Sequence, residues 1–227
     1  MTSVTPLGTT PDLADLAVLS RRFEDAPATE IVAWATERFG DGLVLASSFQ
    51  DCVLLDIALK VDPGLEVVFL DTGFHFAETM WFADRLRQRY RMNLTVMHPA
   101  VEVGDMWQID VDSCCGARKV EPLARALEGR VAWLTAVRRV EAPTRANTPI
   151  VSYDIGRGLV KVNPLAGWTD DQVDAYIAEH DLPVHPLIDR GYPSIGCWPC
   201  TRPVAPGEDP RAGRWSGQTK TECGLHA

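Results

Sequence analysis

Short apolar runs and amphipathic segments alternate along most of the chain. Runs typical of buried strands occupy four segments: 42–49, 65–72, 93–98 and 131–137. Segments with the apolar spacing of helices follow the first three of them, at 52–61, 76–90 and 114–129. This alternation predicts an α/β fold, a mostly parallel sheet with helices on both faces.

Two helices are expected ahead of the first strand. Thr10 and Pro11 suit the cap and the first position of a helix that runs to about residue 22. Residues 31–40 predict a second helix that ends on a glycine. Residues 1–9 are expected to be disordered.

The pattern changes beyond the fourth strand. Segments 148–154 and 159–165 flank an Ile-Gly-Arg-Gly turn and predict a hairpin at the edge of the sheet. Thr169 is placed to cap a helix that runs to about His180. Residues 183–227 contain many prolines and glycines with little periodicity, which predicts a long irregular tail.

Composition narrows the classes of function. A chain of 227 residues suits one large domain, and its net charge of −9 argues against nucleic acid as a partner. No apolar run approaches the roughly 20 residues that span a bilayer, and the first residues lack the features of a secretory signal. We therefore expect a cytoplasmic protein with no membrane partner, whose six cysteines serve as thiols, metal ligands or catalysts.

Basic residues gather near the C-terminus. Arg202, Arg211, Arg214 and Lys220 lie close together in the sequence of this acidic chain. Such a patch suits a small anionic ligand, and a solvated tail explains it equally well.

Polar residues follow the first two strands, at the edge where parallel sheets bind ligands. Ser47 and Ser48 could face an anion at a helix N-terminus, although the segment lacks the triphosphate-binding loop GxxxxGK[ST] and also suits an ordinary turn. Asp71, Thr72 and Gly73 close the second strand, where an acidic side chain can accept a hydrogen bond from ribose or adenine. A plain Asp-Thr-Gly turn remains the alternative.

Four cysteines form a pattern, the adjacent pair Cys114-Cys115 and the pair Cys197-x-x-Cys200. Four thiolates satisfy either a tetrahedral zinc or a cubane iron–sulfur cluster. Neighbouring residues at the start of a helix point about 100° apart, which suits two corners of one large cluster better than a single zinc ion. The spacing favours the cluster and leaves zinc and a redox-active dithiol open.

The other two cysteines differ from each other. Cys52 lies in an apolar run and is expected to be a buried small hydrophobe. Cys223 is nearly terminal and expected to be exposed, with Lys220 and His226 close enough in sequence to lower its pKa. It is either a nucleophile or an incidental tail thiol. His75 is expected to be structural rather than catalytic.

From about residue 40 to the end, the sequence resembles the cysteine-dependent sulfonucleotide reductases. Within them it is most similar to the iron–sulfur adenosine 5′-phosphosulfate (APS) reductases of bacterial sulfate assimilation. The matching motifs are SSF, LDTG, CCGARKVEPL, VRRVEAPTR, VNPLAGWT, PSIGCWPCT, DPRAGRW and KTECGLH. The resemblance departs at Ser216, where the family often has a second aromatic residue.

The resemblance implies a fold and a set of roles. The fold would be adenine nucleotide alpha hydrolase-like, of the PP-loop and Rossmann-like kind. It implies one [4Fe-4S] cluster per subunit on Cys114, Cys115, Cys197 and Cys200, and Cys223 as the nucleophile. Residues implied to bind the substrate are Ser47, Ser48, Phe49, Asp71, Thr72, Gly73, Lys119, Arg138, Arg211, Arg214 and His226. Among these, Lys119, Arg211 and Arg214 would grip the phosphosulfate.

The implied reaction converts APS to sulfite and AMP through an S-sulfocysteine on Cys223, with thioredoxin as the electron donor. The 3′-phosphorylated substrate (PAPS) is the nearest alternative, although PAPS-specific relatives lack the cluster cysteines. A PP-loop tRNA thiolase would need an SGGxDS loop, from which SSFQDC departs, and a zinc-stapled nucleotide-binding module is a third alternative.

These interpretations divide the chain into three parts. They are an N-terminal helical segment (1–40), a nucleotide-binding reductase domain that carries the cluster (41–200) and a flexible C-terminal tail with the catalytic cysteine (201–227). The sequence leaves the oligomeric state open, a homo-oligomer included.

Overall fold

A six-stranded sheet forms the centre of the computed structural model, which describes residues 12–226. The strands are β1 (Leu43–Ser47), β2 (Glu66–Leu70), β3 (Asn93–Met97), β4 (Ala132–Leu134), β5 (Val151–Asp154) and β6 (Leu159–Val162). Their order is β3-β2-β1-β4-β6-β5, and all neighbours are parallel except the β5–β6 hairpin at the edge. The predicted mostly parallel sheet and its edge hairpin are confirmed.

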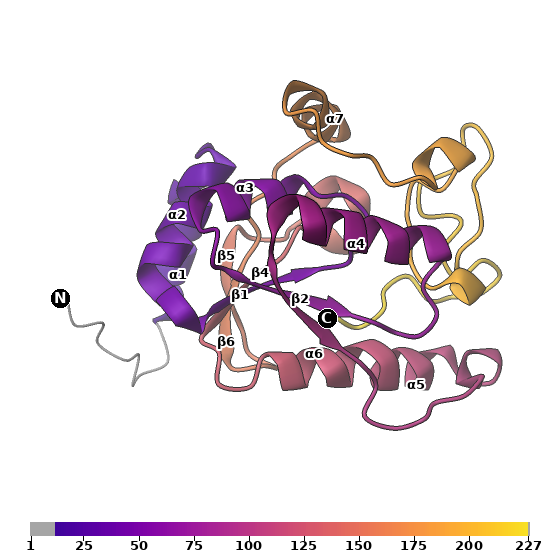
Figure 1. The fold of residues 1–227 in the computed structure, drawn as a ribbon. Coiled ribbons are helices and arrows are strands. Elements are labelled where there is room, and N and C mark those ends of the chain that lie inside the picture. The colour runs from indigo at the N-terminus through magenta and orange to yellow at the C-terminus, as the bar shows by residue number, and fades with distance from the viewer. Residues whose placement is uncertain (1–11, 227) are drawn as a thin grey trace.

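Helices cover both faces of the sheet (Figure 1). In that view α3 (Val53–Val61) and α4 (Ala77–Tyr90) lie above the strands, and α6 (Glu121–Ala126) lies below them. A large apolar cluster fills the space between the sheet and the helices α3 and α4. A smaller cluster between α6 and the sheet includes Leu123 and Trp133. Because both faces are covered, the central strands are apolar on both sides, which explains their continuous apolar runs.

The N-terminal helices pack into the larger of these clusters. Helix α1 (Leu13–Arg22) begins after Asp12, whose carboxylate accepts the backbone N–H of Ala14 at 2.8 Å. Thr10 and Pro11, expected to start this helix, lie outside the described residues, as does the segment 1–9 expected to be disordered. Helix α2 (Ala28–Phe39) begins earlier than predicted and ends at Gly40, as expected.

The helix predicted over 114–129 begins earlier and is not uniform. Asp110 caps α5 (Val111–Cys115), a π-helical turn follows at Gly116–Val120, and α6 completes the run. The two adjacent cysteines therefore end α5 instead of starting a helix. A π-helical turn rotates the residues that follow it, and such turns are frequent at functional sites.

The chain beyond β6 contains one longer helix, α7 (Asp170–Glu179), which Thr169 caps together with Gln172 as predicted. The segment that follows is irregular apart from short 3-10 turns at Ile188–Arg190 and Trp198–Cys200. In Figure 1 this segment, coloured orange to yellow, lies beside the ends of α4 and α5. The division of the chain at residues 40 and 200 stays a prediction.

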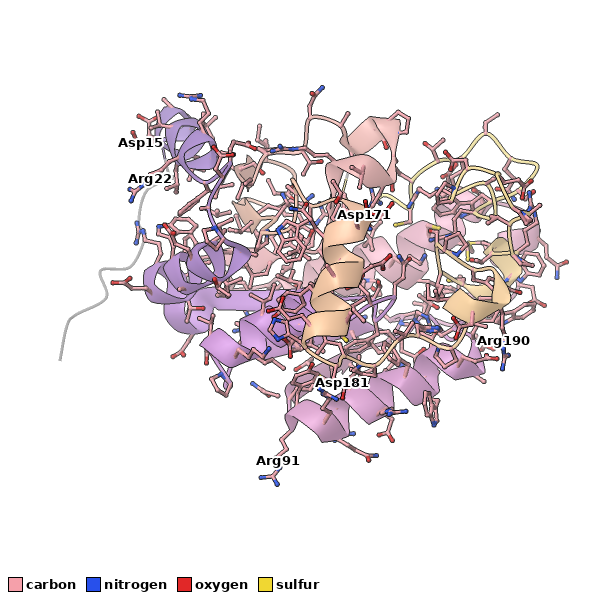
Figure 2. All side chains as sticks on the ribbon, turned by 90° about the horizontal axis from the view of Figure 1, so that it is seen from above. Asp15, Arg22, Arg91, Asp171, Asp181 and Arg190 are labelled. Atoms are coloured by element: carbon pink, nitrogen blue, oxygen red, sulfur yellow. The ribbon has the colours of Figure 1, made fainter. Side chains whose placement is uncertain are left out.

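Charged side chains point outward from the helices. Seen from above, Asp15, Arg22 and Arg91 lie at the rim of the molecule, whereas Asp171 lies on the helix that faces the viewer (Figure 2), and each is exposed. No helix among residues 12–226 is both long and apolar enough to cross a membrane.

Candidate active site

A cavity of about 540 Å³ opens at the carboxyl ends of the strands. Its floor comes from the segments after β1 and β4, which are neighbours in the sheet. The strand order reverses between them, because β1 leads to β2 on one side and β4 leads to β5 and β6 on the other. This is the switch point at which open α/β sheets bind ligands. Predicted site residues that line the cavity are Ser47, Ser48, Phe49, Thr72, Lys119, Arg138, Cys197, Arg211, Arg214, Cys223 and His226.

The turn after β1 is tightly built. The backbone N–H of Phe49 donates to Ser47 Oγ at 3.2 Å, and that of Val53 donates to Asp51 Oδ1 at 3.0 Å. Phe49 has a φ of +55°, a conformation that costs energy for a side chain of this size. Its ring is fully buried against Phe69, with 5.0 Å between ring centroids, and this packing holds the turn in place.

The segment after β4 supplies the opposite wall. Thr135 donates its hydroxyl to Asn163 Oδ1 at 3.0 Å, and the N–H of Val137 donates to Thr135 Oγ1 at 3.3 Å. Arg138 is buried, and its Nη1 lies 2.8 Å from Asp170 Oδ1 as an ion pair. Sequence reasoning missed Thr135 and Val137, because no chemical motif marks them, although their place at a strand end could have.

Two cations in the cavity have no carboxylate partner among the described residues. The Lys119 side chain is buried near Cys197 and Cys223. Burial lowers the pKa of Lys119, and the negative charge of nearby thiolates outweighs this effect and raises it. Arg214 donates only to neutral oxygens, Ser194 Oγ and the Ile195 carbonyl, both at 3.3 Å, and burial lowers its pKa. Such an arrangement suits an anionic ligand.

Gly196 makes room for one of these cations. A Cβ at this position would overlap the Arg214 guanidinium. A side chain at the glycine of the Ile-Gly-Cys sequence would therefore force the Arg214 guanidinium to shift from its place against the backbone.

The tail returns to the cavity and carries Cys223 into it. Cys223 is half-buried, so the expectation of an exposed thiol was wrong. Leu225 packs against the smaller apolar cluster, and His226 stacks on Trp133 with 5.6 Å between ring centroids. Burial, and then the charges of Lys161 and three arginines, lower the pKa of His226 well below its usual value. These contacts hold the tail against the wall of the cavity.

The cysteines of the two pairs line one small cavity next to the large one. Lys119 and Cys197 belong to both linings, so the two cavities share a wall. Burial raises the pKa of Cys114, of Cys200 and of Cys115, the last to about 11. Thr72 Oγ1 lies 3.4 Å from Cys197 Sγ. The structure thus brings together the four cysteines that the sequence had paired only by pattern.

Some of the predicted residues lie outside the large cavity. Asp71 accepts the N–H of Gly73 at 2.9 Å within its own turn, and neither residue lines the cavity. His75, in contrast, lines the cavity. Its Nε2 donates to the Leu70 carbonyl at 2.9 Å and its ring packs tilted against Phe69, consistent with a structural histidine. Cys52 is buried, and burial raises its pKa to about 12, as expected for a thiol that does no chemistry.

The basic patch predicted near the C-terminus separates in three dimensions. Arg202 pairs with exposed Glu208 on the surface, and Lys220 pairs with Asp112 of α5. Arg211 and Arg214 alone face the cavity. The solvated interpretation fits Arg202, and the anionic ligand at Arg211 and Arg214 stays a prediction.

The fold and the cavity define an α/β protein of the adenine nucleotide alpha hydrolase-like class, with a cationic cavity at the switch point of its sheet. Residues 42–203 match the family described as phosphoadenosine phosphosulfate reductase domain, and the chain belongs to this family.

Relatives in several bacteria are similar over their whole lengths. The chain is 48% identical to the adenosine 5′-phosphosulfate reductase of Rhodococcus opacus, over 95% of each chain. It is 47% identical to the protein of the same name from Mycolicibacterium smegmatis, over 100% of this chain and 99% of the relative.

Solved structures show the same fold. A phosphoadenylyl-sulfate (PAPS) reductase from Candida auris, in a phosphate complex, matches with a TM-score of 0.76 and 28% identity, over 86% of this chain and 99% of the other. An FMN adenylyltransferase from Candida glabrata matches with a TM-score of 0.61 and 14% identity, over 87% of this chain and 69% of the other. The second likeness concerns the fold alone.

Proposed function

We propose that this protein reduces APS to sulfite and AMP in sulfate assimilation, with a thioredoxin-like dithiol protein as the electron donor. One observation carries the proposal: the Cys223 thiol lines the same cavity as Lys119 and Arg214, two cations without a carboxylate partner among residues 12–226. A nucleophile beside an anion site at a nucleotide-binding switch point is what the reaction requires. The names of the bacterial relatives support the same substrate.

In this proposal the cavity divides between the two halves of the substrate. Ser47, Ser48, Phe49, Thr72 and Arg138 form the adenosine pocket, and Asp71 and Gly73 are left out because they lie outside the cavity lining. Lys119, Arg211 and Arg214 bind the phosphosulfate, and His226 closes the pocket from the tail. Guanidinium and ammonium groups form charge-assisted hydrogen bonds with such anions.

The first chemical step is attack by the Cys223 thiolate on the sulfur of the sulfate group. A bond forms between the two sulfur atoms, and the bond from that sulfur to the phosphate oxygen breaks. AMP leaves with the electron pair, and its developing charge is stabilised by Lys119 and Arg214. The product is an S-sulfocysteine on Cys223.

The second step needs the donor protein. One of its thiolates attacks Cys223 Sγ, so that sulfite leaves with the electron pair of the broken sulfur–sulfur bond and a mixed disulfide forms. The second donor thiol then displaces Cys223. Two thiols become one disulfide, which supplies the two electrons that sulfate needs to become sulfite.

We also propose that the small cavity holds one [4Fe-4S] cluster per subunit. Its lining offers four thiols and no carboxylate or imidazole, a donor set that fits such a cluster. When bound, the cluster would supply a cross-link between α5 and the tail and a charge beside the substrate. The positive charge of its iron would stabilise thiolates that burial alone disfavours.

The PAPS alternative is tested on the same protein. The four cysteines favour APS, since the resemblance restricts the cluster to APS-reducing members of the family. Assays with each substrate at equal concentration should give a much higher kcat/KM for APS. Family membership also argues against a tRNA thiolase and a non-catalytic zinc module.

Replacement of the nucleophile tests the proposed function. The C223S variant should keep its iron and bind APS, yet produce no sulfite, because binding and chemistry depend on different groups. Mass spectrometry of wild-type protein mixed with APS should find a sulfite-sized adduct on the peptide that contains Cys223. An adduct on another cysteine, or sulfite production by C223S, would overturn the assignment.

We further infer a cytoplasmic location. None of the six cysteines, which all lie within residues 12–226, forms a disulfide, and this supports a reducing compartment.

A further inference from the structure

The carboxylate of Glu222 lies directly before Cys223 in the tail and makes a dense set of contacts. Arg145 donates to it through two nitrogens, Nε to Oε1 at 2.8 Å and Nη2 to Oε2 at 2.7 Å. The Thr144 hydroxyl donates to Oε1 at 3.1 Å, and Arg211 Nη2 lies 3.4 Å from Oε2. A two-point guanidinium contact fixes the orientation of a carboxylate as well as its position.

Arg145, which binds the Glu222 carboxylate, is itself held in place. Arg145 Nη1 donates to Glu141 Oε2 at 2.5 Å, and the same oxygen accepts the backbone N–H of Arg138 at 3.1 Å. Arg138 belongs to the wall of the cavity after β4. A continuous chain of hydrogen bonds therefore joins the tail to the segment that would bind the nucleotide.

Both sides of the contact are largely shielded from water. The Arg145 side chain is 13% exposed and the Glu222 side chain 21%. Burial opposes the charge of Glu222, yet the hydrogen bonds and charge of Arg145 outweigh it and lower the pKa of this carboxyl. Because adjacent Cα atoms are about 3.8 Å apart, the place of Glu222 closely limits the place of the next residue.

We infer that Glu222 is a positioning residue, whose contact with Thr144 and Arg145 holds the Cys223 thiol inside the cavity. This inference rests on the proposed function in one respect, that Cys223 is the nucleophile which the contact positions. The contact itself is observed in the structure. The second chemical step requires a protein thiol to reach Cys223, so the contact must open and close in each turnover.

Alkylation of Cys223 tests the inference without any turnover. Protein that keeps its bound iron is treated with N-ethylmaleimide in the absence of substrate. Trypsin cleaves after Lys220, and the alkylated fraction of the peptide 221–227 is followed with time. Relative to wild type, E222A should react about tenfold faster or more, as expected when a charge-assisted contact is lost.

Two further variants separate position from charge. T144V removes one hydrogen bond to Glu222 and no charge, and its Cys223 should be alkylated a few-fold faster than in wild type. Such an acceleration cannot come from a changed charge beside the thiol. E208A is the matched control, because Glu208 lies in the same tail and its carboxylate accepts from Arg202 and the Ala205 N–H, away from segment 138–145. It should react as wild type does.

A kinetic measurement completes the test. The E222A substitution should slow the formation of the S-sulfocysteine on Cys223 in a single turnover about tenfold or more, since a small displacement of a nucleophile greatly lowers the rate of its attack. APS should bind C223S and the C223S/E222A double variant within about threefold of each other.

Two results would overturn the inference. One is alkylation of E222A at the rate of wild type or of E208A. The other is a T144V variant that behaves as wild type together with an E222A acceleration that vanishes at alkaline pH, where the thiol is ionised in both proteins. Sulfite production by C223S would instead refute the proposed function and leave the alkylation result intact.

Discussion

Lys119 and Arg214 matter at the residue scale because each is a cation shielded from water beside a thiol, Lys119 buried and Arg214 partly buried. Burial of an unpaired charge is costly, and an incoming anion would remove that cost. The two residues come from distant parts of the chain, α5–α6 and the tail, so their shared use by one ligand would also draw these parts together.

Removal of either cation should weaken the binding of APS. We expect K119A and R214A to raise the Kd about 10- to 100-fold, since a charge-assisted hydrogen bond contributes about 1.5–3 kcal/mol. R214K should not restore binding fully, because an ammonium group cannot reproduce the planar guanidinium fork. Calorimetric titration of the C223S protein gives the affinities without turnover.

AMP separates contact with sulfate from a merely structural role. It keeps the phosphate and lacks the sulfate, so a residue that contacts sulfate should affect APS binding more than AMP binding. R202A is the control, because Arg202 pairs with Glu208 on the surface and should leave both affinities unchanged. Equal losses for APS and AMP in both cavity variants would contradict the sulfate contact.

At the element scale, His185 fastens the irregular segment after α7 to α4. Its Nδ1 accepts the backbone N–H of Leu187 at 3.2 Å, so Nε2 carries the proton and donates to Thr79 Oγ1 at 3.0 Å. Thr79 lines the cavity, and Phe82 packs edge-on against the imidazole. Only the neutral ring fits these partners, and burial lowers the pKa of His185 to about 4.

This histidine should make the protein less stable in mild acid. In the unfolded chain its pKa is about 6.5, so below that pH the unfolded state takes up a proton that the folded state does not bind. The contribution is complete above pH 6.5 and is lost as the pH falls toward 4, by about 1–2 kcal/mol at pH 5. Urea unfolding followed by tryptophan fluorescence from pH 5 to 8 measures it.

The H185Q variant isolates the effect. It cannot take up a proton, so the difference in unfolding free energy between wild type and variant should shrink as the pH falls from 7 to 5. A difference that stays constant over this range would show that His185 does not contribute to the pH dependence.

At the scale of the whole molecule, four cysteines from two distant segments line one small cavity. Cys114 and Cys115 end α5, Cys197 precedes the short turn Trp198–Cys200, and Cys200 ends that turn. A shared cluster would tie the helix below the sheet to the segment that completes the active site. Its loss would therefore reach the large cavity through Lys119 and Cys197, which line both cavities.

Serine replacements should separate cluster ligands from the other cysteines. C115S should lose most of its iron and its activity together, and the protein should lose its absorbance near 400 nm. C52S is the matched control, a buried thiol that lines neither cavity, and should keep a full iron content. Iron and sulfide analysis after anaerobic purification measures both, and normal iron and turnover in C115S would exclude a shared cluster.

Local patterns in the sequence were sufficient for the elements and for the class of fold. Apolar runs located the central strands, because burial on both faces of a parallel sheet demands such runs there. A turn between two further segments marked the edge hairpin β5–β6. Thr169 and Gly40 marked helix ends, since caps depend on a few neighbouring residues. The helix after β3 was placed less well, because a π-helical turn leaves no mark in the apolar spacing.

The chemistry of single motifs was also visible in the sequence. The pairs Cys114-Cys115 and Cys197-x-x-Cys200 predicted one shared site, and the structure places their side chains around one cavity. The residue types alone carry this information, because closely spaced cysteines are typical ligands of zinc and of iron–sulfur clusters.

Which groups meet was decided only by the tertiary structure. The pairing of Glu222 with Thr144 and Arg145, the walls at Thr135 and Val137, and the burial of Cys223 all depend on the order of the strands and the path of the tail. The exclusion of Asp71 from the cavity depends on them too. Hydrophobic periodicity records which face of an element is buried and carries no information on which distant side chain it will face. Local sequence therefore determined the elements and the reactive groups, and the long-range packing of the sheet and tail determined their partners.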